Sequence, residues 1–503
     1  MSAAPLPNIN SLCITCGIEK EALRINTKGE IAVSPHPAAL GSALCHPMIT
    51  TDFAECLAEV ITGVHSSKNS LMTELQDTVV YLSHHMLEDE LLWPASMPPP
   101  IEYETRVNIA RFGTSPIGRL KHLYRIGLAE RYGVRKQSIA GIHYNVSLEE
   151  NLFKNCAESD RLPFLNNKAL KNHYYMQLIQ QFMMNQWLLI LLFSASPFAM
   201  ITPKSAESSN RFNQKHAISC RLGPHGYRNS EIDPLSIRYD SLEHYITDIQ
   251  RLTQRPSQQY AHIPDLHSRQ PKQLSRNVLQ IENEFYSSIR PKPQRMEGLS
   301  PSLCLQEQGV GYLEIRLFDL NPFTPLSVSK EQLYFTDAFL MHCLMQRHAP
   351  FDGLLSTKQS NQVIQFGQNP GTELVPGCNQ SIKSASMKLL ENIKNVAQWM
   401  DSVSNEPHHV SAVEQQMQKI ENWQDLPHQK MLALTPDYHA SILDLAHNHR
   451  HTLLQTPLSK EKFASFDAIA AQSLAHQAAL EKGNASASLL DFYQSNLYFT
   501  ETK

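Results

Sequence analysis

The chain has 503 residues, of which 42% are hydrophobic and 18% are charged, and its formal net charge at pH 7 is -4. These values exclude a predominantly disordered protein, because a chain of this length and composition buries a large apolar core. The slightly negative charge argues against a nucleic-acid-binding surface over the whole molecule.

The segment "GIEKEALRI" (residues 17–25) predicts a strand on which two glutamates share one face. Successive strand side chains point to opposite faces, so Glu19 and Glu21 are expected side by side, with Lys20 on the other face. Two carboxylates this close repel each other unless a positive group lies between them. Taken alone, the pair fits either a solvent-exposed surface or a cation site.

The segment "TTDFAECLAEVIT" (residues 50–62) predicts a helix whose N-cap is Asp52 or a preceding threonine. On this helix Asp52, Glu55 and Glu59 share one side, and apolar residues form another stripe. A solvated acidic face is the simpler interpretation of this segment by itself.

Two further segments predict strands with one apolar and one polar face, "GIHYNVSL" (residues 141–148) and "GYLEIRLFDLNPF" (residues 311–323). His143 lies on the polar face of the first, and Glu314 and Arg316 share a face of the second. Individually, a structural histidine and a solvent-facing ion pair are the more common outcomes. Long helical or irregular stretches separate these strands, which favours an α+β fold with a largely antiparallel sheet.

The most apolar segment, "WLLILLFSASPFAMI" (residues 187–201), predicts a buried core helix that ends before Pro197. It is too short to span a bilayer, and the N-terminus does not resemble a signal peptide, so we expect a cytoplasmic protein without membrane association. The nine cysteines form no paired framework, and Cys13 and Cys16, which make the one C-x-x-C pair, are expected to be reduced thiols. From about residue 330 the chain is mostly helical, which predicts a core region over residues 1–330 and a helical region over residues 331–503.

Together the acidic residues and one imidazole form an oxygen-rich set of the kind that binds Mg²⁺ or Mn²⁺. Such ions commonly neutralise a polyphosphate. No P-loop or Rossmann glycine motif is present. The segments "GRLKHLYRIGLAERYG" (residues 118–133) and "CRLGPHGYRN" (residues 220–229) add arginines and tyrosines, which fit an anionic substrate or an ordinary surface.

The amino-acid sequences of these motifs resemble those of the bacterial glutamate–cysteine ligases (γ-glutamylcysteine synthetases). "GIEKEALRI" resembles the first strand of that family, and the resemblance continues in order through "LLWPASMP", "SIAGIHYNVSL", "NVLQIENEFYSSIRPK" and "GYLEIRLFDLNPFTP", over most of residues 14–330. It weakens in the helical C-terminal third, where Gln368 stands at a position at which an arginine is expected.

The resemblance implies a fold similar to that of glutamine synthetase, with an antiparallel sheet curved into a funnel and surrounded by helices. It implies ATP-dependent joining of the γ-carboxyl of L-glutamate to the amine of L-cysteine through a γ-glutamyl phosphate, the first step of glutathione biosynthesis. The family's metal ligands can be carried over to matching positions of this sequence. The resemblance thus implies that Mg²⁺ or Mn²⁺ is bound by Glu19, Glu21, Asp52, Glu59, His143 and Glu314. Those that it implies around the substrates are Arg125 and Arg316 as catalytic groups and Tyr124, Arg221 and Tyr227 as binding groups. Glu55, Glu282 and Glu284 match the family without an assigned role.

Three alternatives stay open at this point: a ligase with a different amine acceptor, a metal-dependent hydrolase, and a non-catalytic amino-acid-binding relative. A fused glutathione synthetase activity is not expected, because the sequence ends soon after the helical region. The oligomeric state is not predicted, and a monomer is compatible with the sequence.

Overall fold

The computed structural model describes residues 6–162, 166–199, 217–227, 229–233, 236–294, 300–367, 373–434, 437–483 and 488–495. Gln368 lies outside these residues. Within them, no helix combines the length and the apolar character needed to cross a membrane. All nine cysteines, Cys13 and Cys16 among them, are free thiols.

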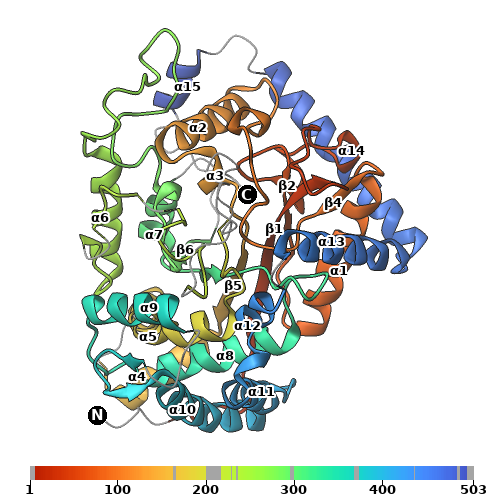
Figure 1. Ribbon diagram of the computed structural model, residues 1–503. Helices are drawn as coiled ribbons and strands as arrows, with labels where there is room; N and C mark the ends of the chain where they lie inside the picture. The colour runs from red at the N-terminus through yellow and green to blue at the C-terminus, as the bar shows by residue number, and fades with distance from the viewer. Residues whose placement is uncertain are drawn as a thin grey trace.

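A seven-stranded antiparallel sheet forms the centre of the molecule (Figure 1). Its strands are β1 (Ile14–Asn26), β2 (Ile49–Thr51), β3 (Leu57–Ile61), β4 (Glu90–Leu92), β5 (Ile142–Leu148), β6 (Ile289–Lys292) and β7 (Tyr312–Phe318). Their order is β2-β3-β1-β5-β7-β6, and β4 pairs with one end of β1. The predicted strands at residues 17–25, 141–148 and 311–323 are therefore confirmed as β1, β5 and β7, and they are neighbours in the sheet.

The predicted helix at residues 50–62 is wrong. This segment forms β2 and β3, joined by a tight turn in which the Asp52 amide donates to the Leu57 carbonyl at 3.0 Å. The i, i+3, i+7 spacing of the acids suggested a helix, and "LAEVI" has no period-two alternation of apolar and polar residues that would have argued against it. Pairing of β3 with the long strand β1 then decides its conformation.

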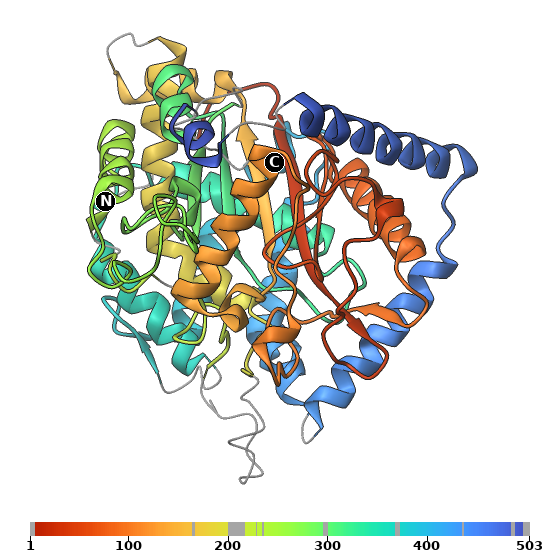
Figure 2. The same cartoon turned by 90° about the horizontal axis from the view of Figure 1, so that it is seen from above.

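Helices surround the sheet on several sides (Figures 1 and 2). In the first part of the chain these helices are α1 (Lys68–His85), α2 (Pro116–Tyr132), α3 (Val134–Gln137), α4 (Glu150–Asp160), α5 (Asn167–Phe193), α6 (Leu242–Gln254), α7 (Pro301–Gln308) and the 3-10 helix η5 (Glu282–Glu284). The apolar segment ends its helix at Phe193, before Pro197 as predicted. The expected mixture of helices around a large antiparallel sheet is thus confirmed.

The C-terminal part is mostly helical, as the periodicity predicts. It contains α8 (Lys330–Met345), α9 (Gly353–Phe366), α10 (Ile382–Val403), α11 (His409–Glu421), α12 (Pro427–Leu432), α13 (Tyr438–Gln455), α14 (Lys460–Gly483) and α15 (Leu489–Ser495), with a small hairpin of β8 (Leu374–Val375) and β9 (Gln380–Ser381). Helix α13 packs against α1 and β4, and α10 and α11 pack against α8 (Figure 1). One continuous apolar core joins residues from both sides of residue 330. The division at this residue stays a prediction.

Candidate active site

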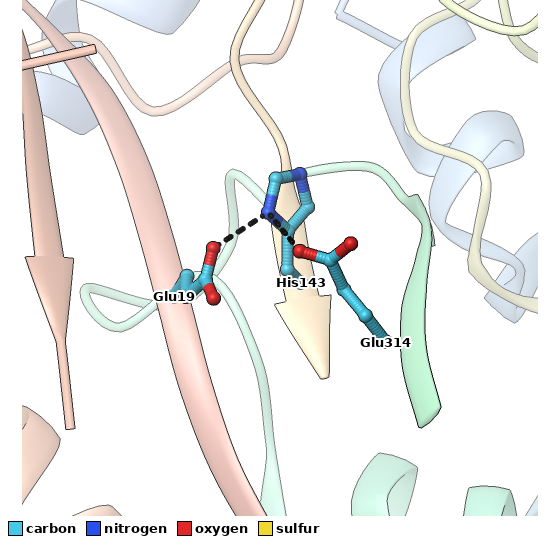
Figure 3. Close-up of side chains that lie close together, drawn as sticks. All are labelled: Glu19, His143 and Glu314. Carbon is cyan, nitrogen blue, oxygen red and sulfur yellow. Dashed lines mark hydrogen bonds and ion pairs between the residues drawn. The ribbon is translucent and has the colours of Figure 1, made fainter. Parts of the chain in front are cut away.

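Three side chains from three adjacent strands converge on one face of the sheet (Figure 3). Glu19 on β1 is paired in register with His143 on β5, and His143 Nδ1 lies 3.0 Å from Glu19 Oε2. Glu314 on β7 approaches from the other side, with Oε1 4.0 Å from the same nitrogen. One donor atom from each residue lies within 4.8 Å of the other two. A single ion could contact all three side chains.

The protonation states of this cluster suit a hard divalent cation. Burial lowers the pKa of His143 to about 4, with a further contribution from Arg316, so the imidazole is neutral near pH 7. Burial alone would raise the pKa of Glu314, but the nearby Lys292 and Arg316 outweigh it and lower the pKa to about 2. Two carboxylates and a neutral imidazole are a donor set that fits Mg²⁺ or Mn²⁺.

The other predicted metal ligands lie close to this cluster, on β1, on β3 and in the turn between β2 and β3. Glu21 Oε1 lies 3.7 Å from His143 Nε2, and its Oε2 accepts from the Gly141 amide at 2.8 Å. Glu59 on β3 lies directly opposite Glu21 in register and is completely buried. Asp52 lies in the turn between β2 and β3, with Oδ1 3.9 Å from Nη2 of Arg125. Their role as ligands stays a prediction.

A cavity of about 260 Å³ opens over this face of the sheet. Ten of the eleven predicted site residues line it, and Glu59 is the exception; the ten are Glu19, Glu21, Asp52, Tyr124, Arg125, His143, Arg221, Tyr227, Glu314 and Arg316. These ten residues come from three strands, from α2 and from the segments between elements, and the first and last of them are more than 290 positions apart in sequence.

The residues predicted to contact the substrates are held in place by hydrogen bonds to the backbone and by aromatic contacts. The Arg125 guanidinium donates through Nε to the Asp52 carbonyl and stacks 4.5 Å from the centre of the Phe112 ring. Arg221 Nη2 donates to the Arg316 carbonyl at 2.7 Å, and a Cβ on Gly141 would lie 2.3 Å from that nitrogen. A glycine is therefore needed for Arg221 to pack against the start of β5.

Three basic residues of this cavity were not predicted from the sequence: Lys136 on α3, and Arg290 and Lys292 on β6. Arg290 pairs with Glu314 in register, and Lys292 Nζ lies 3.8 Å from Glu314 Oε1. With Arg316 Nη1 at 3.2 Å from the same carboxylate, they make the β6–β7 side of the cavity positive. The i, i+2 spacing in "IRPK" was the available signal, but the strand is short and contains a proline.

The glutamates without an assigned role accept hydrogen bonds within the scaffold. Glu55 accepts from the amides of His36 and Arg111, and Glu282 accepts from the amide and hydroxyl of Ser302. Glu284 forms a buried ion pair with Arg131 at 3.0 Å and also lines the cavity.

Comparison with known proteins identifies relatives over nearly the whole chain. A family model described as glutamate–cysteine ligase matches residues 8–364. The glutamate–cysteine ligase of Pseudomonas paraeruginosa is 36% identical over 498 residues, which cover 96% of this chain and 93% of that protein. The enzyme of the same name from Shewanella oneidensis is 36% identical over 500 residues, with 95% and 94% covered.

A solved structure supports the same relationship. The crystal structure of glutamate–cysteine ligase from Francisella tularensis in complex with AMP has a TM-score of 0.87 and 29% sequence identity, and the match covers 98% of both chains. The family model, the relatives and the fold agree along the chain. The chain belongs to the glutamate–cysteine ligase family.

Proposed function

We propose that this protein joins the γ-carboxyl of L-glutamate to the amine of L-cysteine at the expense of ATP, which becomes ADP and phosphate. Within a chain of this family, the observation that carries the proposal is a cavity in which a candidate metal cluster lies directly beside a group of basic side chains. The cluster is Glu19, His143 and Glu314, and the basic residues Arg290, Lys292 and Arg316 lie next to Glu314. ATP and glutamate are both anions, so a site that brings them together needs this concentration of positive charge.

Five carboxylates and one imidazole would hold Mg²⁺ or Mn²⁺. They belong to Glu19, Glu21, Asp52, Glu59, Glu314 and His143. When bound, the metal supplies neutralisation of the phosphate charge. The Glu19 and Glu314 carboxylates are fixed by Asn145 and Arg316, which donate to them at 3.0 and 3.2 Å. These contacts reduce the reorganisation needed to form the metal site.

Arg125 and Arg316 would stabilise the charge that develops as the glutamate γ-carboxylate attacks the γ-phosphate of ATP. A γ-glutamyl phosphate would result, and the cysteine amine would then displace phosphate. A protein nucleophile is not needed for either step. Tyr124, Arg221 and Tyr227 would line the substrate pockets, and Tyr227 is held by its hydroxyl, which donates to the Glu284 carbonyl at 2.7 Å.

The proposal extends to three properties of the whole molecule. We expect the sheet to curve into a funnel like that of glutamine synthetase, since residues of β1, β5, β6 and β7 all line a cavity on one face. We expect a cytoplasmic enzyme that functions without nucleic acid or membrane, because its substrates are small metabolites. A monomer suffices for the proposed chemistry, since all the site residues named above come from one chain.

The deciding assay measures ADP release with Mg²⁺ and L-glutamate, in the presence and absence of L-cysteine. We expect release that depends on cysteine and an equal amount of γ-glutamylcysteine. Release without cysteine would indicate a hydrolase instead. Equal rates with alanine or another small amine would indicate a ligase with a different acceptor.

A variant of Glu19 tests the role of the cluster. Glu19→Gln should abolish turnover but change the melting temperature little, because the amide keeps a hydrogen-bond acceptor and relieves carboxylate repulsion. Glu391→Gln, which alters an exposed glutamate on α10, is the matched control and should keep full activity. A large fall in the melting temperature of Glu19→Gln alone would assign Glu19 to a structural ion pair.

A further inference from the structure

Six lysine and arginine side chains line the active-site cavity, and five of them already contact an oxygen atom of the protein. Each of these five lies within 4 Å of a carbonyl or carboxylate oxygen. The contacts are those of Arg290 with Asn283 at 3.1 Å, Lys292 with Glu314 at 3.8 Å, Arg316 with Glu314 at 3.2 Å, Arg125 with Asp52 at 3.9 Å and Arg221 with Asp319 at 3.8 Å. The sixth residue is Lys136 on α3.

The ammonium group of Lys136 has no such partner. This residue is half-buried, and no residue that the structure describes forms a hydrogen bond or an ion pair with it. The preceding residue, Arg135, donates through Nη2 to the Ile101 carbonyl at 3.0 Å and lies 3.4 Å from Glu104. Arg135 thus anchors α3 to the protein, and Lys136 is available to a ligand in the cavity.

A second donor without a partner lies next to Lys136. The side-chain Nε2 of Gln137 is buried in the cavity lining, and it makes no hydrogen bond within the described part of the chain. Buried amide groups in proteins normally do have a hydrogen-bond partner. An ammonium group and an amide N–H on adjacent residues can donate to the two oxygens of one carboxylate.

The position of α3 associates Lys136 with the predicted substrate residues. Helix α3 packs against α2, which carries Tyr124 and Arg125 (Figure 1). The chain then leads from α3 directly into the N-terminal end of β5. Lys136 therefore lies near groups that we propose to bind the substrates.

The cations beside the candidate metal cluster belong to a different part of the cavity. Lys292 pairs in register with Tyr312, and the Gly311 carbonyl accepts from Ser147 near the C-terminal end of β5. The two ends of β5 are about 20 Å apart, at about 3.3 Å per residue. The phosphates of ATP would already have Arg290, Lys292 and Arg316 beside the cluster. An amino-acid carboxylate is the anion that remains for Lys136.

We infer that Lys136, together with Gln137, binds the α-carboxylate of an amino-acid substrate. The inference rests on the proposed function, because L-glutamate and L-cysteine both carry such a group. The α-carboxylate does not react, since the γ-carboxyl of glutamate and the amine of cysteine do. Lys136 can therefore hold it from substrate binding through both steps, and the contact contributes to KM more than to kcat.

The test compares Lys136→Met with the unmodified full-length chain in the ligase assay. We expect KM for one amino acid to rise by roughly 10- to 100-fold, as for the loss of one charge-assisted hydrogen bond. The value of kcat and KM for ATP should change little. Lys136→Arg keeps the charge and should retain most of the affinity. Lys154→Met, which alters an exposed lysine on α4, is the matched control and should behave as the unmodified protein does.

The acceptor cysteamine, which has the amine and the thiol of cysteine but no carboxylate, distinguishes the two substrates. If Lys136 binds L-cysteine, Lys136→Met should lower kcat/KM for L-cysteine and leave kcat/KM for cysteamine unchanged. If Lys136 binds L-glutamate, KM for glutamate should rise with either acceptor. Lys136→Gln replaces Lys136→Met if the latter does not fold.

Two kinds of failure are separable. Unchanged KM values for both amino acids, or a rise for ATP alone, would overturn the inference while an active unmodified protein still supports the proposed function. An equal loss with L-cysteine and cysteamine at unchanged KM for glutamate would also overturn it. No cysteine-dependent ADP release by the unmodified protein would overturn the proposed function, and this inference with it.

Discussion

Arg131 on α2 and Glu284 in η5 form an ion pair at 3.0 Å whose side chains are both completely buried. Glu284 also accepts from the Tyr132 hydroxyl and from the Gln280 amide, each at 2.5 Å. Its carbonyl accepts from Tyr227. The ion pair therefore holds the peptide that orients one aromatic side chain of the candidate active site.

Glu284→Ala should destabilise the fold by about 3–5 kcal/mol, because it leaves the buried Arg131 without its counter-charge. Glu284→Gln keeps an acceptor and should cost less. The urea dependence of unfolding measures both costs. In the ligase assay, Glu284→Gln should raise KM for the substrate whose pocket Tyr227 lines more than it lowers kcat, since the peptide that accepts from Tyr227 loses the ion pair that holds it. A variant as stable as the unmodified protein would show that Arg131 finds another partner.

Metal binding can be tested without activity, through Glu314. Mg²⁺ should raise the melting temperature of the unmodified protein by binding only the folded state. Glu314→Gln should weaken Mg²⁺ binding by more than about 100-fold, since even the loss of outer-shell partners costs 10–100-fold. Titration calorimetry measures the affinity. Glu391→Gln should bind as the unmodified protein does, and unchanged binding by Glu314→Gln would place the metal elsewhere.

The sequence predicted the strands that carry the candidate metal ligands better than the elements around them. Glu19, His143 and Glu314 were assigned to strand faces from period-two alternation, and the structure places them together. The assignment to strand faces succeeds because the alternation of apolar and polar residues is a local pattern. Alternation does not show which residues of different strands come together, and the family resemblance supplied that information. Asp52 and Glu59 were placed on a helix that does not exist, because pairing with β1 is a long-range effect.

The basic residues of β6 could not be predicted from the sequence. Arg290 and Lys292 lie on a four-residue strand that contains a proline, so their segment has too few alternating positions to predict a strand. Their proximity to Glu314 depends on the β6–β7 pairing, which spans a helix and a loop. A contact of this kind is set by the tertiary fold and has no local signature.

Acid stability should depend on buried histidines outside the site, of which His342 on α8 is the clearest example. Burial lowers its pKa from 6.5 to about 4. Between these pH values the unfolded chain binds a proton that the folded chain does not, so stability is complete above pH 6.5 and falls as the pH falls towards 4. His342→Leu should reduce the slope of unfolding free energy against pH by about 1.4 kcal/mol per unit in this range. Above pH 7 the two slopes should coincide, and coincidence below pH 6 would contradict the prediction.

Behind the sheet, Lys68 on α1 and Asp337 on α8 form a second buried pair at 2.6 Å. Asp337 also accepts from the Tyr144 hydroxyl at 2.8 Å, and Lys68 Nζ lies 3.4 Å from the Cys16 sulfur. Tyr144 is next to His143 on β5 but points to the other face of the strand. The pair thus fixes the back of the strands that carry the candidate metal ligands.

Asp337→Ala should cost about 3–5 kcal/mol, because a buried ammonium and the Tyr144 hydroxyl both lose their partner. The double variant Lys68→Met with Asp337→Asn removes both charges and keeps an acceptor for Tyr144. Its cost should be well below the sum of the two single costs, since neither charge is left unpaired. Urea unfolding of the two singles and the double gives the coupling directly, and additive costs would mean that solvent already compensates one of the charges. Mg²⁺ affinity should change little in the double variant, because His143 and its neighbours keep their strand pairing.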